Sequence, residues 1–167
     1  DFMNMLTAHI VHRIGAYTQD FAEHSRYLSR YLHKVEVILP PVELPETSDA
    51  AKRHFLEQHN PDGRHPVIGM ATRFASEKGV EVLLEALPTV LEKYPNAKVL
   101  YAGQWQDVMQ EEAYLARLLP RIERYIEAGQ WEFLGVLTQE QMAAFYPALD
   151  VLVVPSLNST ETFGLVQ

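Results

Sequence analysis

Apolar residues follow two patterns along residues 67–154. Short continuous apolar runs alternate with longer segments in which apolar residues recur every three or four positions. The continuous runs are typical of strands covered on both faces, and the recurrent spacing is typical of amphipathic helices. The alternation predicts parallel strands joined by right-handed crossovers. The predicted fold class is therefore α/β, with a doubly wound parallel sheet.

The same pattern gives bounds for the elements. We expect strands at 67–71, 97–102, 131–134 and 150–154, and helices at 79–94, 107–127 and 138–146. Two residue pairs, Asp107 with Gln110 and Thr138 with Gln141, have the spacing of capping boxes that would open the last two helices. With the usual strand order 3-2-1-4, the strand at 150–154 is an apolar edge. We expect the chain to self-associate through this edge.

The first part of the chain has a weaker pattern and ends in a segment rich in proline. We expect a helix at 1–12, a weak strand at 13–18, an amphipathic helix at 20–32 and a strand at 35–39. The following PPVELPE stops regular structure and stiffens the connection. We therefore place a boundary there, with residues 1–45 as the end of one domain and a linker, and residues 46–167 as a second domain. Ser48 is the expected N-cap of a short helix at 47–60.

Composition contributes mainly by exclusion. The 167 residues carry a formal net charge of −8 and are 47% hydrophobic, which is the balance of a globular protein. A basic stripe is missing, so we expect no nucleic-acid partner. The sequence contains no cysteine, and no carboxylate is spaced to complete a metal site with its seven histidines. Without an apolar run of about 18 residues or a signal pattern, we expect a cytoplasmic protein; peripheral membrane contact of the full-length protein stays open.

Candidate chemistry first appears in the loop after the strand at 67–71. Arg73 and Lys78 flank the opening of the next helix, five residues apart. Two cations beside a helix N-terminus are able to clamp a diphosphate, with a bidentate fork from arginine and a point charge from lysine. Ordinary surface charges, with Glu77 pairing locally, are the alternative interpretation. The loop lacks a GxGxxG fingerprint, and Lys78-Gly79 reverses the order of a P-loop.

The last segment, PSLNSTETFGLVQ, is a second candidate. Glu161 is its one carboxylate, and Gly164 would let the backbone approach a ligand closely. A carboxylate that accepts hydrogen bonds from hydroxyls, beside donating amides, suits a polyol. A helix N-cap region with Glu161 near the helix dipole is the alternative.

Taken together, these motifs resemble a known family. The segments VIGMATRFASEKGVEVLLEALPTVLEKYP, VLYAG, FLG, AFYPALDVLVVPS and ETFGLV look like the donor-binding domain of retaining GT-B glycosyltransferases, family 4. The pair Arg-x4-Lys-Gly and Pro-Ser…Glu-x-Phe-Gly-Leu carries most of the resemblance. More weakly, RIGAYTQDFAEHSRYLSRYLHKVEVILPP resembles the last strand–helix–strand of the family's N-terminal domain. Pro40-Pro41-Val42-Glu43 departs from the family's Pro-Asn-Gly.

The resemblance implies a Rossmann-like GT-B C-terminal domain, incomplete and preceded by the end of the N-terminal domain. It implies a metal-independent hexosyltransferase of carbohydrate biosynthesis without a cofactor, whose donor substrate is a nucleotide-diphosphate sugar. Three implied catalytic residues hold the diphosphate and the sugar hydroxyls: Arg73, Lys78 and Glu161. The residues implied to line the base, sugar and phosphates are Gly103, Val136, Leu137, Phe163, Gly164 and Leu165.

The expected function is transfer of a sugar to an acceptor hydroxyl with retention of configuration. The acceptor is open: a sugar, a lipid-linked glycan or a small molecule. The family's second glutamate, eight positions after Glu161, falls at position 169, beyond Gln167. We therefore expect this chain to be a fragment that binds the donor and is inactive alone. The alternatives are a non-catalytic nucleotide-sugar-binding module and a GT-B-fold sugar-nucleotide epimerase.

Overall fold

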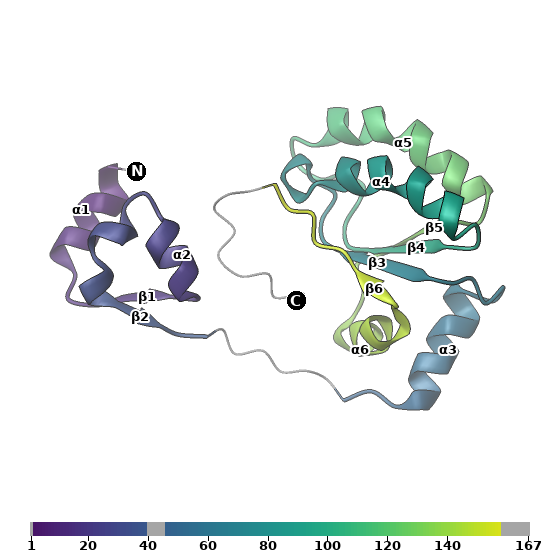
Figure 1. Ribbon diagram of the computed structural model, residues 1–167, viewed down its shortest axis with the longest axis horizontal. Helices are drawn as coiled ribbons and strands as arrows, with labels where there is room; N and C mark the ends of the chain where they lie inside the picture. The colour runs from purple at the N-terminus through teal and green to yellow at the C-terminus, as the bar shows by residue number, and fades with distance from the viewer. Residues whose placement is uncertain (1, 40–45, 158–167) are drawn as a thin grey trace. The chain divides into compact units, whose positions relative to one another are not determined.

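The computed structural model describes residues 2–39 and 46–157 (Figure 1). Residues 2–39 and residues 46–157 form two compact units. Each unit is described by itself below.

The first unit is a small parallel β-α-β arrangement. Its strands β1 and β2 pair in parallel, with Ile14 opposite Val35. Lys34 fastens the first helix to this pair, because its Nζ donates to the carbonyls of Ala8, His9 and Val11 at 2.8–3.2 Å. Its elements are α1 (Phe2–Ile10), β1 (Ile14–Ala16), α2 (Gln19–His24), the 3₁₀ turns η1 (Leu28–Arg30) and η2 (Leu32–Lys34), and β2 (Val35–Val37).

The helix expected at 20–32 is only half correct. The α-helix ends at His24, and Ser25 takes an extended backbone with ψ 131°. The Ser25 hydroxyl then accepts a hydrogen bond from the amide of Leu28 at 3.4 Å. Serine competes with helix continuation through such local bonds, so the chain proceeds in 3₁₀ turns.

The second unit is a four-stranded parallel sheet with helices on both faces. The strand order is β5-β4-β3-β6, and every neighbouring pair is parallel. Helices α4 and α5 cover one face, and α3 and α6 cover the other (Figure 1). The predicted fold class and strand order are confirmed. The elements are α3 (Asp49–His59), β3 (Val67–Ala71), η3 (Ser76–Lys78), α4 (Val80–Lys93), β4 (Lys98–Ala102), α5 (Glu112–Glu127), β5 (Trp131–Gly135), α6 (Gln139–Ala148) and β6 (Val151–Leu152).

The pleat of β4 explains why its sequence is apolar throughout. Val99 and Tyr101 pack with the α4 and α5 core, whereas Leu100 and Ala102 pack with the α3 and α6 core. Successive side chains of a strand point to opposite faces, so a strand between two helical layers needs apolar residues at both parities. Strand β6 forms the outer edge of the described sheet, and Val151 on it is exposed. Self-association through this edge stays a prediction.

The two expected capping boxes have different outcomes. Thr138 and Gln141 form a complete capping box at the start of α6. The box expected from Asp107 and Gln110 is wrong, because both residues have left-handed backbones, with φ 54° and 66°, and α5 begins only at Glu112. An N-cap residue needs an extended backbone to direct its side chain at the first amides. The chain instead forms a longer loop after β4.

Candidate functional site

Four loops meet at the edge of the sheet where the parallel strands end. This is the edge at which open α/β sheets bind ligands. The loops after β3 and β4 are joined by hydrogen bonds from Thr72 N to Ala102 O, at 2.9 Å, and from Phe74 N to Gln104 O, at 2.7 Å. The loops after β4 and β5 are joined from Gly103 N to Gly135 O, at 2.7 Å. Backbone hydrogen bonds therefore hold the loops of this edge together without a ligand.

The segment after β6 is fastened to the loop after β3. The carbonyl of Glu77 accepts from the amide of Leu157 at 2.8 Å and from the Ser156 hydroxyl at 3.3 Å. Gly79 has φ 71°, and a Cβ on it would lie 2.1 Å from the carbonyl oxygen of Pro155. Only glycine fits at this crossing. The loop after β3 therefore lies against the beginning of the second candidate segment, at residues 155–157.

Arg73 and Lys78 both belong to this loop, between β3 and α4. An Nη2–Oε1 contact of 2.5 Å pairs Arg73 with Glu77, and both side chains are partly exposed, at 54% and 37%. Lys78 is the last residue of η3, directly before Gly79. The start of η3 is held by the Glu111 carboxylate, which accepts from the amide and hydroxyl of Ser76 at 3.0 and 3.2 Å. The loop after β3 thus holds two cations and one carboxylate, and the segment before α5 adds a second carboxylate, Glu111.

The first turn of α4 offers fewer donors than the sequence suggests. The amide of Glu81 donates to the hydroxyl of Tyr114 at 3.3 Å, and the amide of Val82 donates to Gly79 O at 3.0 Å. The helix dipole still favours an anion here, but these two amides already have protein acceptors. Burial raises the pKa of Tyr114, and burial raises the pKa of Tyr101 in the core beside it, so both phenols stay neutral at physiological pH.

The other residues that the resemblance implies for the donor site differ in exposure and packing. Gly103 has φ 133°, and a Cβ on it would lie 2.0 Å from Thr72 O, so this glycine lets two loops approach closely. Val136 is 77% exposed at the start of the loop after β5, and Leu137 packs against the α3 and α6 core. Glu161, Phe163, Gly164 and Leu165 lie outside the described residues.

An aromatic stack borders the same edge. Trp105, in the loop after β4, stacks on Phe133 of β5 with ring centroids 4.2 Å apart and an interplanar angle of 10°. A cavity of about 390 Å³ lies beside Trp105 and is also lined by Glu111 and Leu115. Glu111 has no sequence signal, since it lies 35 residues from the serine that it holds.

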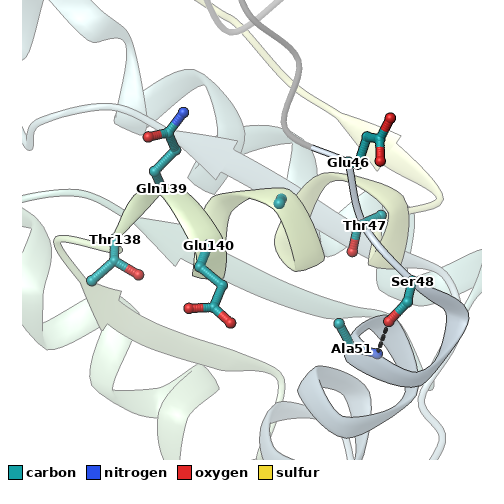
Figure 2. Close-up of a pocket in the computed structure, with 8 residues that line it drawn as sticks. Glu46, Thr47, Ser48, Ala51, Thr138, Gln139 and Glu140 are labelled. Carbon is teal, nitrogen blue, oxygen red and sulfur yellow. Dashed lines mark hydrogen bonds between the residues drawn. The ribbon is translucent and has the colours of Figure 1, made fainter.

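A larger hollow, of about 840 Å³, opens where α3 and α6 begin (Figure 2). Glu46, Thr47 and Ser48 border it from the α3 side, and Thr138, Gln139 and Glu140 border it from α6. The Ser48 hydroxyl accepts from the amide of Ala51 at 3.1 Å, so this helix start is capped internally. The described residues that line this hollow include no lysine or arginine, so it suits a diphosphate less well than the Arg73 loop does.

Neither a metal-binding cluster nor a membrane-spanning helix is present among the described residues. Across residues 2–39 and 46–157, no group of three or more histidine, aspartate or glutamate side chains is arranged so that it could hold a metal ion. None of the helices in these two ranges combines the length and the apolar character needed to cross a membrane.

Comparison with known proteins gives a consistent result. The family model described as "Glycosyl transferases group 1" matches residues 51–167. A D-inositol 3-phosphate glycosyltransferase of Segniliparus rotundus is 28% identical over 156 residues, which are 92% of this chain and 33% of that protein. An uncharacterized glycosyltransferase of Methanocaldococcus jannaschii is 30% identical over 96 residues, which are 56% of this chain and 22% of that protein. The chain spans between 19% and 33% of the length of the curated relatives it matches.

Solved structures share the fold. Anabaena HepE, crystallised in complex with UDP, aligns with a TM-score of 0.72 at 20% identity, over 90% of this chain and 40% of that one. Sucrose-phosphate synthase of Thermosynechococcus elongatus aligns with a TM-score of 0.73 at 23% identity, over 99% of this chain and 41% of that one. At these identities the likeness shows the architecture alone.

Proposed function

The chain belongs to the glycosyl transferases group 1 family, and we propose that it is the donor-binding part of an enzyme that moves a sugar from a nucleotide-diphosphate sugar to an acceptor hydroxyl. The transfer retains the configuration of the sugar. Residues 46–167 bind the donor in this proposal, and residues 1–45 are the end of the domain that contributes the acceptor side. We propose a cytoplasmic location and no cofactor.

The observation that carries the proposal is the position of Arg73 and Lys78. Both lie in the loop after β3, at the carboxyl edge of a parallel sheet. Arginine presents a planar fork of N–H donors to phosphate oxygens, and lysine adds a compact positive charge. Anabaena HepE, with the same architecture, was crystallised with UDP and with UDP-glucose. That likeness supports a nucleoside diphosphate as the group held here.

The chemical role of the two cations follows from where charge develops. As the bond between sugar and diphosphate breaks, negative charge grows on the leaving diphosphate, and fixed positive groups stabilise it in the transition state. The acceptor hydroxyl attacks the same face of the sugar. Glu161 holds sugar hydroxyls in this proposal, with donating amides at Phe163, Gly164 and Leu165. The base lies by Val136 and Leu137, near Gly103.

Substitution of the cations in the native-length protein tests the proposal. We expect Arg73→Ala and Lys78→Ala each to lower turnover by roughly 10²–10³-fold, because each removes one group that stabilises the leaving group. Isothermal titration with UDP, ADP and GDP, together with product analysis of a transfer assay, provides the measurements. Lys93→Ala, which removes an exposed charge at the far end of α4, is the control.

Three results would overturn the proposal. They are unchanged turnover and affinity in both variants, binding of the donor without any transfer to an acceptor, and an epimerised nucleotide sugar as the product.

A further inference from the structure

The guanidinium of Arg73 is already paired with a carboxylate of the same chain in the structure. Glu77 lies four residues further along the same loop and pairs with it at 2.5 Å. A carboxylate and a phosphate offer a guanidinium the same kind of acceptor, two oxygens that match its fork. The Glu77 carboxylate therefore occupies a position on Arg73 that a diphosphate would need.

The backbone of Glu77 is fixed, whereas its side chain has room to move. Its carbonyl accepts from both Leu157 and Ser156, and the turn around it is closed by Lys78 N to Ala75 O, at 2.9 Å, and Gly79 N to Ser76 O, at 3.3 Å. The side chain itself is 37% exposed. Rotation of this side chain away from Arg73 leaves every one of those backbone contacts in place.

Exposure also makes the pair easy to exchange. A solvent-exposed ion pair contributes little because water solvates both partners well once they separate. A diphosphate carries more charge than one carboxylate and also reaches Lys78, so it is the stronger partner for this loop. The second carboxylate of the site, Glu111, directly precedes α5 and is bonded to Ser76.

We propose that Glu77 is a positioning residue that acts as an internal counter-ion: it holds the Arg73 side chain while the site is empty and is displaced by the diphosphate of the nucleotide. This inference rests on the proposed function. The competition weakens binding of the nucleoside diphosphate and so favours its release after transfer. Glu77 influences the reaction through Arg73 and contacts neither the sugar nor the acceptor.

The test is a double-mutant cycle in the native-length protein, read by titration with UDP, ADP, GDP and inorganic pyrophosphate. We expect Glu77→Gln to bind the preferred nucleotide roughly 3- to 10-fold more tightly, because the competing charge is gone while the shape is kept. The gain should shrink at about 1 M salt, where exposed charges are screened within ~3 Å. In an Arg73→Ala background the same substitution should change affinity less than about 2-fold, since the residue it acts through is missing.

Glu92→Gln is the matched control. It removes an equal charge from an exposed position near the far end of α4, and its nucleotide affinity should stay at the wild-type value. Weaker or unchanged binding in Glu77→Gln would overturn the inference, and so would an equal gain in the Arg73→Ala background. Both results leave the proposed function standing. Absence of binding of all four probes to the wild type would instead overturn the proposed function and this inference together.

Discussion

Two ion pairs lie at opposite ends of the main sheet, and they differ in burial. At the amino end of β4, Lys98 pairs with Glu132 at 2.8 Å, with side chains that are only 11% and 33% exposed. The Lys98 ammonium also donates to the carbonyl of His59, and His59 Nδ1 lies 2.7 Å from Glu132. At the carboxyl end, Arg73 and Glu77 are 54% and 37% exposed and belong to one loop.

The difference shows how solvent decides what an ion pair does. Lys98 joins α3, β4 and β5, and separating it from its partners would leave a charge in a poorly hydrated position. Such a pair cannot exchange partners and serves the fold. Arg73 is able to exchange Glu77 for another anion at small cost, because water solvates both groups. The same chemistry is structural at one edge and suited to ligand exchange at the other.

The buried pair gives the largest expected effect. We expect Lys98→Met to lower the free energy of unfolding by roughly 3 kcal/mol, because the partly buried Glu132 carboxylate loses its cation and the His59 carbonyl loses its donor. Urea denaturation measures the change, and Lys93→Met at the exposed end of α4 is the control. If the free energies of unfolding of the two variants lie within about 1 kcal/mol of each other, burial of Lys98 adds no stability to its ion pair.

The closeness of the loops at the carboxyl edge is tested by Gly103→Ala. A Cβ there would lie 2.0 Å from the backbone oxygen of Thr72, so we expect a loss of roughly 2–3 kcal/mol of unfolding free energy. Gly63→Ala provides the comparison, since Gly63 also has a positive φ but a Cβ on it would meet nothing within 4 Å. It should cost about 1 kcal/mol. Equal costs at both positions would show that the loop contact adds nothing.

Substitution of Glu111, which is bonded to Ser76, should have a smaller effect on the free energy of unfolding. Glu111→Gln removes the negative charge of the acceptor, and hydrogen bonds to a neutral amide are weaker than hydrogen bonds to a carboxylate. We expect a loss of about 1 kcal/mol in unfolding free energy. Glu112→Gln, one residue further along the chain, should lose no more than about 0.5 kcal/mol as the control. An equal loss in both variants would show that Glu111 does not hold the turn.

The exposed pair of Arg73 and Glu77 should contribute least to the free energy of unfolding. We expect Glu77→Gln to change the free energy of unfolding by less than about 0.5 kcal/mol. Thermal and urea unfolding of this variant, compared with Lys98→Met, measure the contrast between the two edges directly. A loss of more than about 1.5 kcal/mol would mean that Glu77 is a structural residue like Lys98.

The sequence by itself determined the features that depend on a few neighbouring residues, such as strand bounds and helix caps. Apolar runs placed β3, β4 and β5 within one residue of their observed ends, and Ser48 and Thr138 cap the helices that they precede. These strand bounds put Arg73 and Lys78 after the carboxyl end of β3, whereas binding of a ligand by them stays a prediction. Local pairing of Arg73 with Glu77 was open to sequence reasoning too, because the two residues lie only four positions apart.

Tertiary structure alone decided which distant groups meet. The left-handed backbones of Asp107 and Gln110, the bond between Glu111 and Ser76, and the burial of Lys98 against α3 all depend on how separate segments pack. A capping box can be recognised in four residues, whereas the partner of Ser76 lies 35 residues away and has no local signal. Local hydrogen bonds and periodic burial are encoded in short segments, but contacts between loops exist only after the sheet has brought its strands together.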